Sequence, residues 1–207
     1  MELDQNVTSK RGRPKSEEKR QQIKTAAAQL FMSEGFERTS MDNIAAHAGV
    51  SKQTVYSHFA NKDELFRYCI FGKVEEYQLL LDAEESLSLE DGLARLATGY
   101  LELICDERAI SMWRLLIGGA LTHTHMANAF YETGPGATVD SLARFLRQHA
   151  DRISTTDYDE AARTFVALSL GQHQMRVMLG LLDAVSEDER NRQAQTAIRQ
   201  FMAIYER

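Results

Sequence analysis

The sequence predicts an all-α protein. Apolar residues recur with the three- and four-residue spacing of helices over nearly the whole chain of 207 residues, and not with the alternation of strands. The two prolines, Pro14 and Pro135, lie near or between the segments that read as helical. With 43% hydrophobic residues the chain is long enough for a small module fused to a larger one, and we expect two domains.

Charge is distributed unevenly along the chain, whose formal net charge is -6. Residues 8–24 carry seven Lys or Arg against two Glu, whereas residues 68–207 carry thirteen against twenty-one Asp or Glu. A local cationic excess is typical of a segment that binds nucleic acid, because each phosphate contact releases condensed counterions whatever the charge of the remainder. We therefore expect the two ends of the chain to have different partners.

The sequence lacks the signals of several protein classes. No apolar run approaches about eighteen residues and the N-terminus has no signal-peptide stretch, so we expect a cytoplasmic protein without a membrane span. Cys69 and Cys105 form no C-x-x-C pair, which predicts core thiols, and His123 and His125 have no cysteine or carboxylate beside them to complete a metal site. Nucleophile-elbow, zincin and P-loop motifs are absent as well, so we predict no catalytic residue, metal or cofactor.

The first helix is predicted to begin after Ser16, which is a suitable N-cap because Glu17 and Glu18 follow it near the positive helix end. It is predicted to stop at Gly35. Its buried stripe comprises Ile23, Ala26, Ala27, Leu30 and Phe31.

Two short helices are predicted in FERTSMDNIAAHAGVSKQTVYSHFANKDELF, with Thr39 or Ser40 capping the first, Ser51 the second, and Gly49 at the turn between them. Their inner face is apolar and consists of Ile44, Ala45, Ala48, Val50, Val55 and Phe59. The outward set of the second helix is polar: Ser51, Lys52, Gln53, Thr54, Tyr56 and His58. Such groups can touch base edges and phosphates from a major groove, so the pattern favours DNA binding, although helix-turn-helix motifs also occur in proteins that bind no DNA.

The pattern G-F-x-x-T-S followed by I-A-x-x-A-G-V-S-K-x-T-V-Y-x-H-F-x-x-K-x-E-L resembles the DNA-binding domain of the TetR family of bacterial regulators, without gaps over about residues 17–66. The resemblance implies major-groove contacts and phosphate contacts, the latter assigned to Tyr56 and His58. The residues placed in the groove are Lys52, Gln53, Thr54 and Tyr56. Many members carry Gly at position 53, so Gln53 can itself reach a base and the operator sequence cannot be transferred from relatives.

The same resemblance implies that Lys62 grips a phosphate at the start of the next helix, and that Thr39 and Ser40 do so at the start of the preceding one. Alternatives remain for two of the ring side chains. His58 can be a partly buried structural ring, and Tyr56 a core aromatic with its hydroxyl in water.

The sequence R-G-R-P, residues 11–14, resembles the core of an AT-hook, in which Arg11 and Arg13 enter a narrow A·T-rich minor groove. Pro14 is expected to prevent a helix there, so residues 1–15 are predicted to form a flexible basic arm. The alternative is a disordered, solubilising tail without a DNA contact.

From about Lys62 a helix of roughly 24 residues is predicted to connect the helix-turn-helix domain, residues 16–62, to a larger helical domain, residues 63–207. A helical stripe from Leu89 to Ile104 follows, and then apolar segments over residues 110–121 and 126–131 that end at glycines and Pro135. The last helices are expected near 137–150, 157–182 and 187–206.

The segments WRLLIGGAL, AFYETGP and LARFLRQHA resemble the C-terminal domain of the AefR-like branch of the TetR family. The resemblance implies a homodimer through the last two long helices, a ligand cavity in each helical domain, and release from DNA when the cavity fills. Two terminal amphipathic helices independently favour an isologous four-helix contact. The predicted architecture is thus an N-terminal three-helix bundle with a helix-turn-helix, joined by a long helix to a ligand-binding and dimerisation domain.

Large rings with a few polar atoms can surround a drug-sized apolar molecule. The candidate cavity residues are Tyr100, Trp113, Leu116, Phe130, Phe165 and His173. Plain core packing is the alternative for each of them, including His173, which with Gln172 and Arg176 can otherwise orient a polar ligand group. We predict a repressor that binds double-stranded DNA as a homodimer and is released by a small apolar or amphipathic inducer; the alternative is a dimeric DNA-architectural protein without a ligand response.

Overall fold

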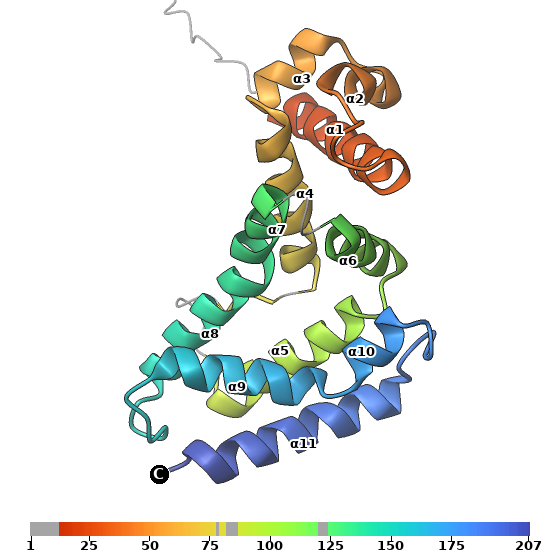
Figure 1. Ribbon diagram of the computed structural model, residues 1–207. Helices are drawn as coiled ribbons and strands as arrows, with labels where there is room; N and C mark the ends of the chain where they lie inside the picture. The colour runs from red at the N-terminus through yellow and green to blue at the C-terminus, as the bar shows by residue number, and fades with distance from the viewer. Residues whose placement is uncertain (1–12, 78, 82–86, 120–123) are drawn as a thin grey trace, which may run out of the picture. The chain divides into compact units, whose positions relative to one another are not determined.

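The computed structural model describes residues 13–77, 79–81, 87–119 and 124–207. In these residues the chain is helical throughout apart from turns, loops and one isolated bridge between Ile153 and Glu206 (Figure 1). The all-α prediction is confirmed. The chain divides into two compact units between Cys69 and Ile70, and no helix in the described ranges is long and apolar enough to cross a bilayer.

The first unit contains α1 (Arg13–Glu34), α2 (Met41–Ala48), α3 (Lys52–His58) and the first part of α4 (Lys62–Glu76). Its core is built on three rings, Phe31, Phe36 and Phe66, whose centroids lie 5.3 to 5.5 Å apart. Around them are the fully buried side chains of Ile23, Ile44, Val55, Phe59 and Leu65. The predicted apolar faces of the helix-turn-helix therefore form one core.

The first helix begins earlier than predicted. α1 starts at Arg13 and includes Pro14, so the expectation that Pro14 prevents a helix was wrong, as was the expected start after Ser16. The reason is that proline is tolerated in the first helical turn, where its missing N–H has no intrahelical partner. The predicted end is confirmed, because Gly35 follows α1 with φ 85° and donates its N–H to the Phe31 carbonyl at 3.1 Å.

The ends of α2 and the start of α3 are set by two serine caps and one glycine. Ser40 Oγ accepts the Asn43 N–H at 3.1 Å, and Ser51 Oγ accepts the Thr54 N–H at 3.1 Å. Gly49 ends α2 with φ 64°, a left-handed conformation that a residue with a Cβ adopts at a cost. The predicted turn at Gly49 and cap at Ser51 are confirmed, and Ser40 rather than Thr39 caps α2.

The predicted long connecting helix is shorter than expected, because α4 ends at Glu76. Beyond it the chain leaves the helix and places Leu79 and Leu81 in the core of the second unit, where they are 1% and 3% exposed. The Leu81 N–H donates to Ser141 Oγ at 2.8 Å, and that hydroxyl donates to the Leu81 carbonyl at 3.1 Å. Core burial and this exchange of hydrogen bonds with α8 overcome the local helical preference of the segment.

The second unit is a helical bundle. Its elements are the rest of α4, then α5 (Leu89–Leu103), α6 (Glu107–Gly119), α7 (Thr124–Tyr131), a π-helical segment η1 (Glu132–Gly136), α8 (Ala137–Gln148), α9 (Tyr158–Leu170), α10 (His173–Met178) and α11 (Glu187–Tyr205). Helices α5, α8, α9 and α11 form the core, in which the Phe165 and Phe201 rings meet edge to face at 5.3 Å; Figure 1 shows α9 running beside α11.

Two helix predictions in this unit were wrong. The helix expected over residues 157–182 is divided into α9 and α10, because Gly171 has φ 50° and the Leu168 carbonyl accepts a hydrogen bond from Gln193 Nε2 at 2.7 Å instead of continuing the helix. Pro135 does not interrupt the chain of helices: it lies in η1, whose wider turn accommodates the missing N–H and joins α7 to α8.

Candidate nucleic-acid interface

Helix α3 is fixed to the first unit by its inner side and leaves its outer side open. Val55 and Phe59 are fully buried. The Arg20 guanidinium from α1 lies 5.5 Å from the Phe59 ring centre and 4.3 Å from that of Tyr68, which ties α1 and α4 to the end of α3. An exposed helical face on so closely packed a support is suited to rigid recognition.

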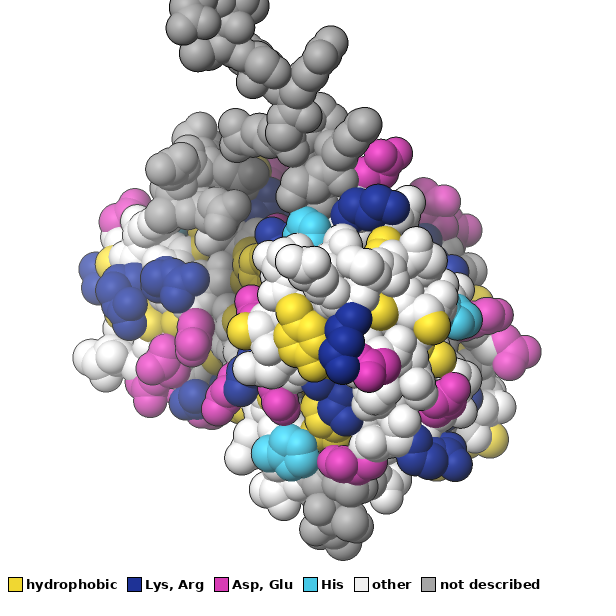
Figure 2. Space-filling model, turned by 90° about the horizontal axis from the view of Figure 1, so that it is seen from above, with side chains coloured by type: hydrophobic (Ala, Val, Ile, Leu, Met, Phe, Trp, Pro, Cys, Tyr) yellow, Lys and Arg dark blue, Asp and Glu magenta, His cyan; other side chains and the backbone are white. Residues whose placement is uncertain are grey.

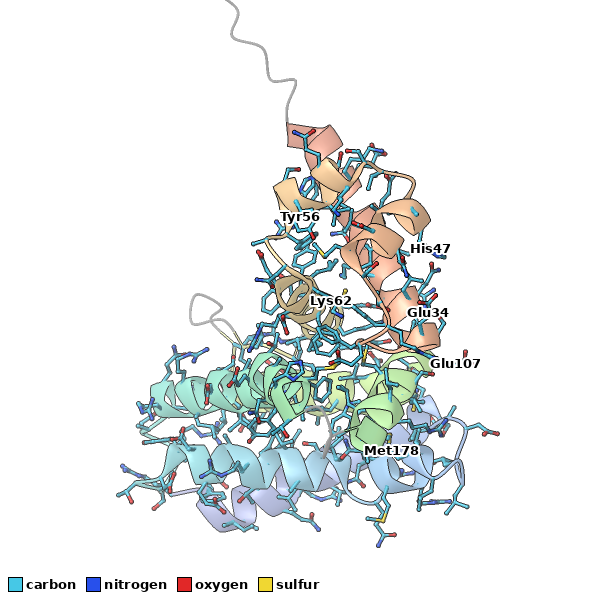
Figure 3. The ribbon with its side chains drawn as sticks, turned by 45° about the horizontal axis from the view of Figure 1, so that its top comes forward. Glu34, His47, Tyr56, Lys62, Glu107 and Met178 are labelled. Carbon is cyan, nitrogen blue, oxygen red and sulfur yellow. The ribbon has the colours of Figure 1, made fainter. Side chains whose placement is uncertain are left out.

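The outer face of α3 is formed by Lys52, Gln53 and Tyr56, which we call the α3 surface. All three side chains are exposed, Tyr56 to 47%. Figure 3 labels Tyr56 on α3. The Lys52 ammonium lies 6.0 Å from the Tyr56 ring centre and forms an ion pair with Asp42 of α2, at 2.8 and 2.9 Å from its two carboxylate oxygens. The hydrogen bond and the charge of Asp42 raise the pKa of Lys52, so the side chain is a cation at neutral pH.

The predicted DNA contacts at the ends of α3 are partly engaged within the protein. Ser51 and Thr54 share a hydrogen bond of 2.7 Å between their hydroxyls, besides the cap described above, so both organise the first turn of α3. His58 is half-buried beside Phe59, with ring centroids 6.4 Å apart, as the structural-ring alternative requires. The alternative in which Tyr56 is a core aromatic does not hold, because nearly half of the Tyr56 side chain is exposed.

The prediction that Thr39 contacts a phosphate was wrong. Its side chain is 1% exposed and its hydroxyl donates to the Gly35 carbonyl at 2.8 Å, so it is not available to a phosphate. Ser40 is exposed, and its hydroxyl keeps a donor for a phosphate while it caps α2. Arg11 lies outside the described residues, and Arg13 is the first residue of α1, with a side chain that is not described.

The Lys62 ammonium is directed at the protein itself. It donates to the carbonyls of Phe36 at 2.7 Å and Thr39 at 2.9 Å, and it lies 4.2 Å from the Phe36 ring centre. An ammonium has three N–H donors, so one remains for the predicted phosphate. The two bonds fasten the loop between α1 and α2 to the start of α4.

Lys62→Met is therefore expected to destabilise the protein by about 1 to 3 kcal/mol, because it leaves two half-buried loop carbonyls without their charged donor. Chemical denaturation followed by circular dichroism measures the change. The matched control is Lys19→Met on the exposed face of α1, which is expected to change stability by less than about 0.5 kcal/mol. Unchanged stability combined with weaker binding to every duplex would instead assign Lys62 to phosphate binding alone.

The candidate cavity residues do not form one group in the second unit. Trp113 of α6 and Phe130 of α7 meet edge to face at 5.0 Å, and Leu116 is buried in α6. Phe165 is part of the helical core, and His173 faces α11, with Nδ1 3.9 Å from a Glu189 carboxylate oxygen. The next residue, Gln174, instead lines the seam described below, and sequence reasoning missed it because the break at Gly171 turns the helix.

Tyr100 is the buried polar group among these candidates. Its hydroxyl is inaccessible to solvent and lies beside the Thr138 side chain of α8. Burial raises the pKa of Tyr100 to about 12, so the phenol is neutral at physiological pH and keeps its proton to donate.

The comparisons with known proteins agree with this arrangement. The profile described as bacterial regulatory proteins, tetR family, matches residues 23–69, which include α2 and α3. The profile described as the AefR-like transcriptional repressor, C-terminal domain, matches residues 91–207, more than half of the chain. The chain belongs to the TetR family. It is a transcriptional regulator with a DNA-binding helix-turn-helix, and hence not an enzyme.

Solved structures of TetR regulators share the whole fold. The flavonoid-responsive regulator FrrA is 32% identical with a TM-score of 0.72, and the alignment covers 92% of this chain and 98% of that one. A TetR-family regulator from Mesorhizobium loti is 29% identical with a TM-score of 0.71, over 93% of this chain and 98% of that one.

The curated relatives match over shorter stretches. TtgR of Pseudomonas putida is 34% identical over 48% of this chain and 49% of its own length. The activator FasR of Mycolicibacterium smegmatis is 44% identical over 24% of this chain and 23% of its own length. Across the first four such relatives the chain spans between 23% and 55% of their length.

Proposed function

We propose that this TetR regulator is a ligand-responsive repressor that binds a palindromic operator as a homodimer and leaves it when a small apolar or amphipathic inducer binds the second unit. The observation that carries the proposal is the α3 surface: Lys52, Gln53 and Tyr56 are exposed together, while Val55 and Phe59 anchor the same helix in the core. A helix presented in this way fits a major groove, where cations and amides bond to base edges.

Exposed apolar side chains near the C-terminus support a dimer. Met175, Leu179 and Leu181, on α10 and just after it, are 66% to 69% exposed, and Ile204 of α11 is also exposed. A water-facing group of large apolar residues on the last helices is suited to burial against the same surface of a second copy. The dimer places two α3 surfaces on one duplex, which accounts for a palindromic operator.

The inducer site is proposed at a seam between α5, α6 and α10. Its lining is apolar except for one amide, and consists of Leu103, Ile104, Ile110, Trp113, Gln174 and Met178. The cavity there is only about 10 Å³, far smaller than a drug-sized molecule requires, so an inducer must move a wall of the seam to enter. Trp113 and Phe130 offer ring edges and faces to an aromatic inducer, and the similar protein FrrA is flavonoid-responsive.

Helix α6 is the wall whose position is coupled to α4. Asp106 caps α6 by accepting the Ala109 N–H at 2.7 Å through Oδ1, and its Oδ2 accepts Lys73 Nζ and the Tyr77 hydroxyl, both at 2.9 Å. Lys73 lies in the last turn of α4, the helix that begins at Lys62 in the first unit, and Tyr77 is the residue after its end. A shift of α6 is thereby transmitted to the helix that leads to the DNA-binding unit.

Selection of bound sequences from a random duplex library by the purified full chain tests the function. An inverted repeat with half-sites about one helical turn apart supports the regulator, and its release by a phenolic or flavonoid compound supports ligand response. Broad binding to A·T-rich duplexes without a repeat supports the architectural alternative. The similar protein FasR is an activator, so a reporter gene behind the selected duplex decides between repression and activation.

Gln53→Ala is expected to change base preference at one position of each half-site and to cost about 1 to 3 kcal/mol there, because an exposed amide at this place can pair with a base edge. Repeating the selection with the variant measures the change. The control Gln22→Ala, an exposed amide on α1, is expected to preserve the wild-type preference. An unchanged preference for Gln53→Ala would remove Gln53 from base readout.

A further inference from the structure

Asp42 is an acidic residue beside the α3 surface that the sequence pattern did not single out. It lies in the first turn of α2, ten positions before Lys52, and the turn at Gly49 brings its carboxylate against the Lys52 ammonium. Both carboxylate oxygens are within 2.9 Å of Nζ. The Lys52 ammonium thus lies between the Tyr56 ring and the Asp42 carboxylate. Seen from above, the molecule exposes basic, acidic and apolar side chains next to one another (Figure 2).

This ion pair does little for stability. The side chains of Lys52 and Asp42 are 60% and 61% exposed, and exposed pairs contribute only about 0 to 1 kcal/mol. The cap of α2 is supplied by Ser40, not by Asp42. The main effect of the ion pair is therefore on the charge and the mobility of the Lys52 ammonium.

Two effects follow for DNA of any sequence. The carboxylate cancels the charge of Lys52, so the pair as a whole attracts phosphates weakly and releases few counterions. The carboxylate also holds the Lys52 side chain, which has about 2 kcal/mol of rotamer entropy, in one direction. A contact between Lys52 and a phosphate elsewhere would have to break the ion pair. Asp42 thus weakens sequence-independent binding.

The ion pair affects a contact between Lys52 and a DNA base differently from a contact with a phosphate. An ammonium held by Asp42 keeps an N–H donor in a defined position above α3, next to Tyr56. A guanine O6 or N7 that lies at that position can accept it while the ion pair persists, and the ordering of the side chain has already taken place. Asp42 therefore lowers the affinity for the operator less than it lowers the affinity for other duplexes.

We propose that Asp42 is a specificity-determining residue, which restrains Lys52 so that its ammonium contributes to binding at the operator and not on other DNA. The inference rests on the proposed DNA-binding function of the α3 surface. Asp42 acts through Lys52 and does not itself contact a base.

Asp42→Asn tests the inference, since it removes the charge and keeps the shape. The affinity of the full chain is measured for the duplex selected above and for a scrambled duplex of the same composition, over a series of salt concentrations. We expect the variant to bind the scrambled duplex about threefold to tenfold more tightly, with a salt dependence steeper by about one phosphate contact. Affinity for the selected duplex is expected to change by less than about threefold, so the specificity ratio falls.

Controls separate a local effect from a general change in charge. Glu34→Gln removes the same charge at the end of α1, away from Tyr56 in the first unit (Figure 3), and is expected to preserve the ratio. In a Lys52→Met background, Asp42→Asn is expected to leave the ratio unchanged, because the restrained cation is gone. Asp42→Ser, which also removes the charge, is the second variant if Asp42→Asn does not fold.

The inference is overturned if Asp42→Asn strengthens binding to both duplexes by the same factor, if it leaves the ratio unchanged, or if Glu34→Gln lowers the ratio equally. These outcomes leave the proposed function intact, because the wild type still discriminates between the two duplexes. A wild type that selects no duplex at all contradicts the proposed function itself.

Discussion

Gly99→Ala is expected to lower the melting temperature by about 3 to 10 °C. A Cβ at position 99 would lie 2.2 Å from the Tyr77 carbonyl oxygen and 3.1 Å from Leu79 Cδ2. The nearest atom belongs to the backbone, so no change of rotamer relieves the clash, and α5 must move away from the end of α4. Overpacking of this kind costs about 1 to 3 kcal/mol.

Thermal unfolding followed by circular dichroism measures the effect. The control is Gly118→Ala in α6, where a Cβ would meet no atom within 4 Å from other elements in the part of the chain that the structure describes, and where alanine is the better helix former. This variant is expected to melt at or slightly above the wild-type temperature. Equal melting temperatures for Gly99→Ala and the wild type would show that the close approach of α5 to Tyr77 is absent in solution.

Structure that depends on neighbouring residues was predictable from the sequence. The caps at Ser40 and Ser51 and the turn at Gly49 each involve partners within five residues, and chain order displays such partners directly. The alternation of faces on α3 is equally local, because Val55 and Phe59 are one turn apart. The exposed α3 surface followed from these two facts.

Structure decided by distant residues was not predictable. α4 ends at Glu76 because Leu79 and Leu81 find burial and a hydrogen-bond partner on α8, about sixty positions later. The break at Gly171 depends likewise on Gln193 of α11. Propensity favours a continuous helix in both places, and tertiary contacts overrule it.

The same distinction applies within the candidate site. Thr39 and Lys62 have side chains that suit phosphates, yet Thr39 is buried against Gly35, and two of the Lys62 donors are used by loop carbonyls more than twenty residues away. Asp42 was missed for a related reason. Its partner Lys52 is on another helix, and no periodicity links the two positions.

Asp106→Ala is expected to destabilise the protein by about 2 to 4 kcal/mol at pH 7. The change removes the cap of α6, which contributes about 1 kcal/mol, and leaves Lys73 and Tyr77 without their common acceptor. The side chains of Asp106 and Lys73 are only 16% and 26% exposed, so water replaces the lost acceptor poorly. The control Glu76→Gln, which removes the more exposed partner of Lys73, is expected to cost less than about 1 kcal/mol.

The pH dependence of this difference identifies the carboxylate as its cause. Burial by itself raises the pKa of Asp106, but hydrogen bonds from Lys73, the Ala109 N–H and Tyr77 outweigh it and leave the pKa below its ordinary value. A carboxyl whose pKa is lower in the folded state stabilises the protein fully at pH values above its pKa in the unfolded chain, about 3.9. This stabilisation is lost as the pH falls through the pKa of the folded state. The stability difference between the wild type and Asp106→Ala should thus be constant from pH 5 to 8 and shrink below about pH 4, as denaturation at each pH measures. A difference that persists at low pH would mean that the packing of the Asp106 side chain, and not its charge, holds α6 to the end of α4.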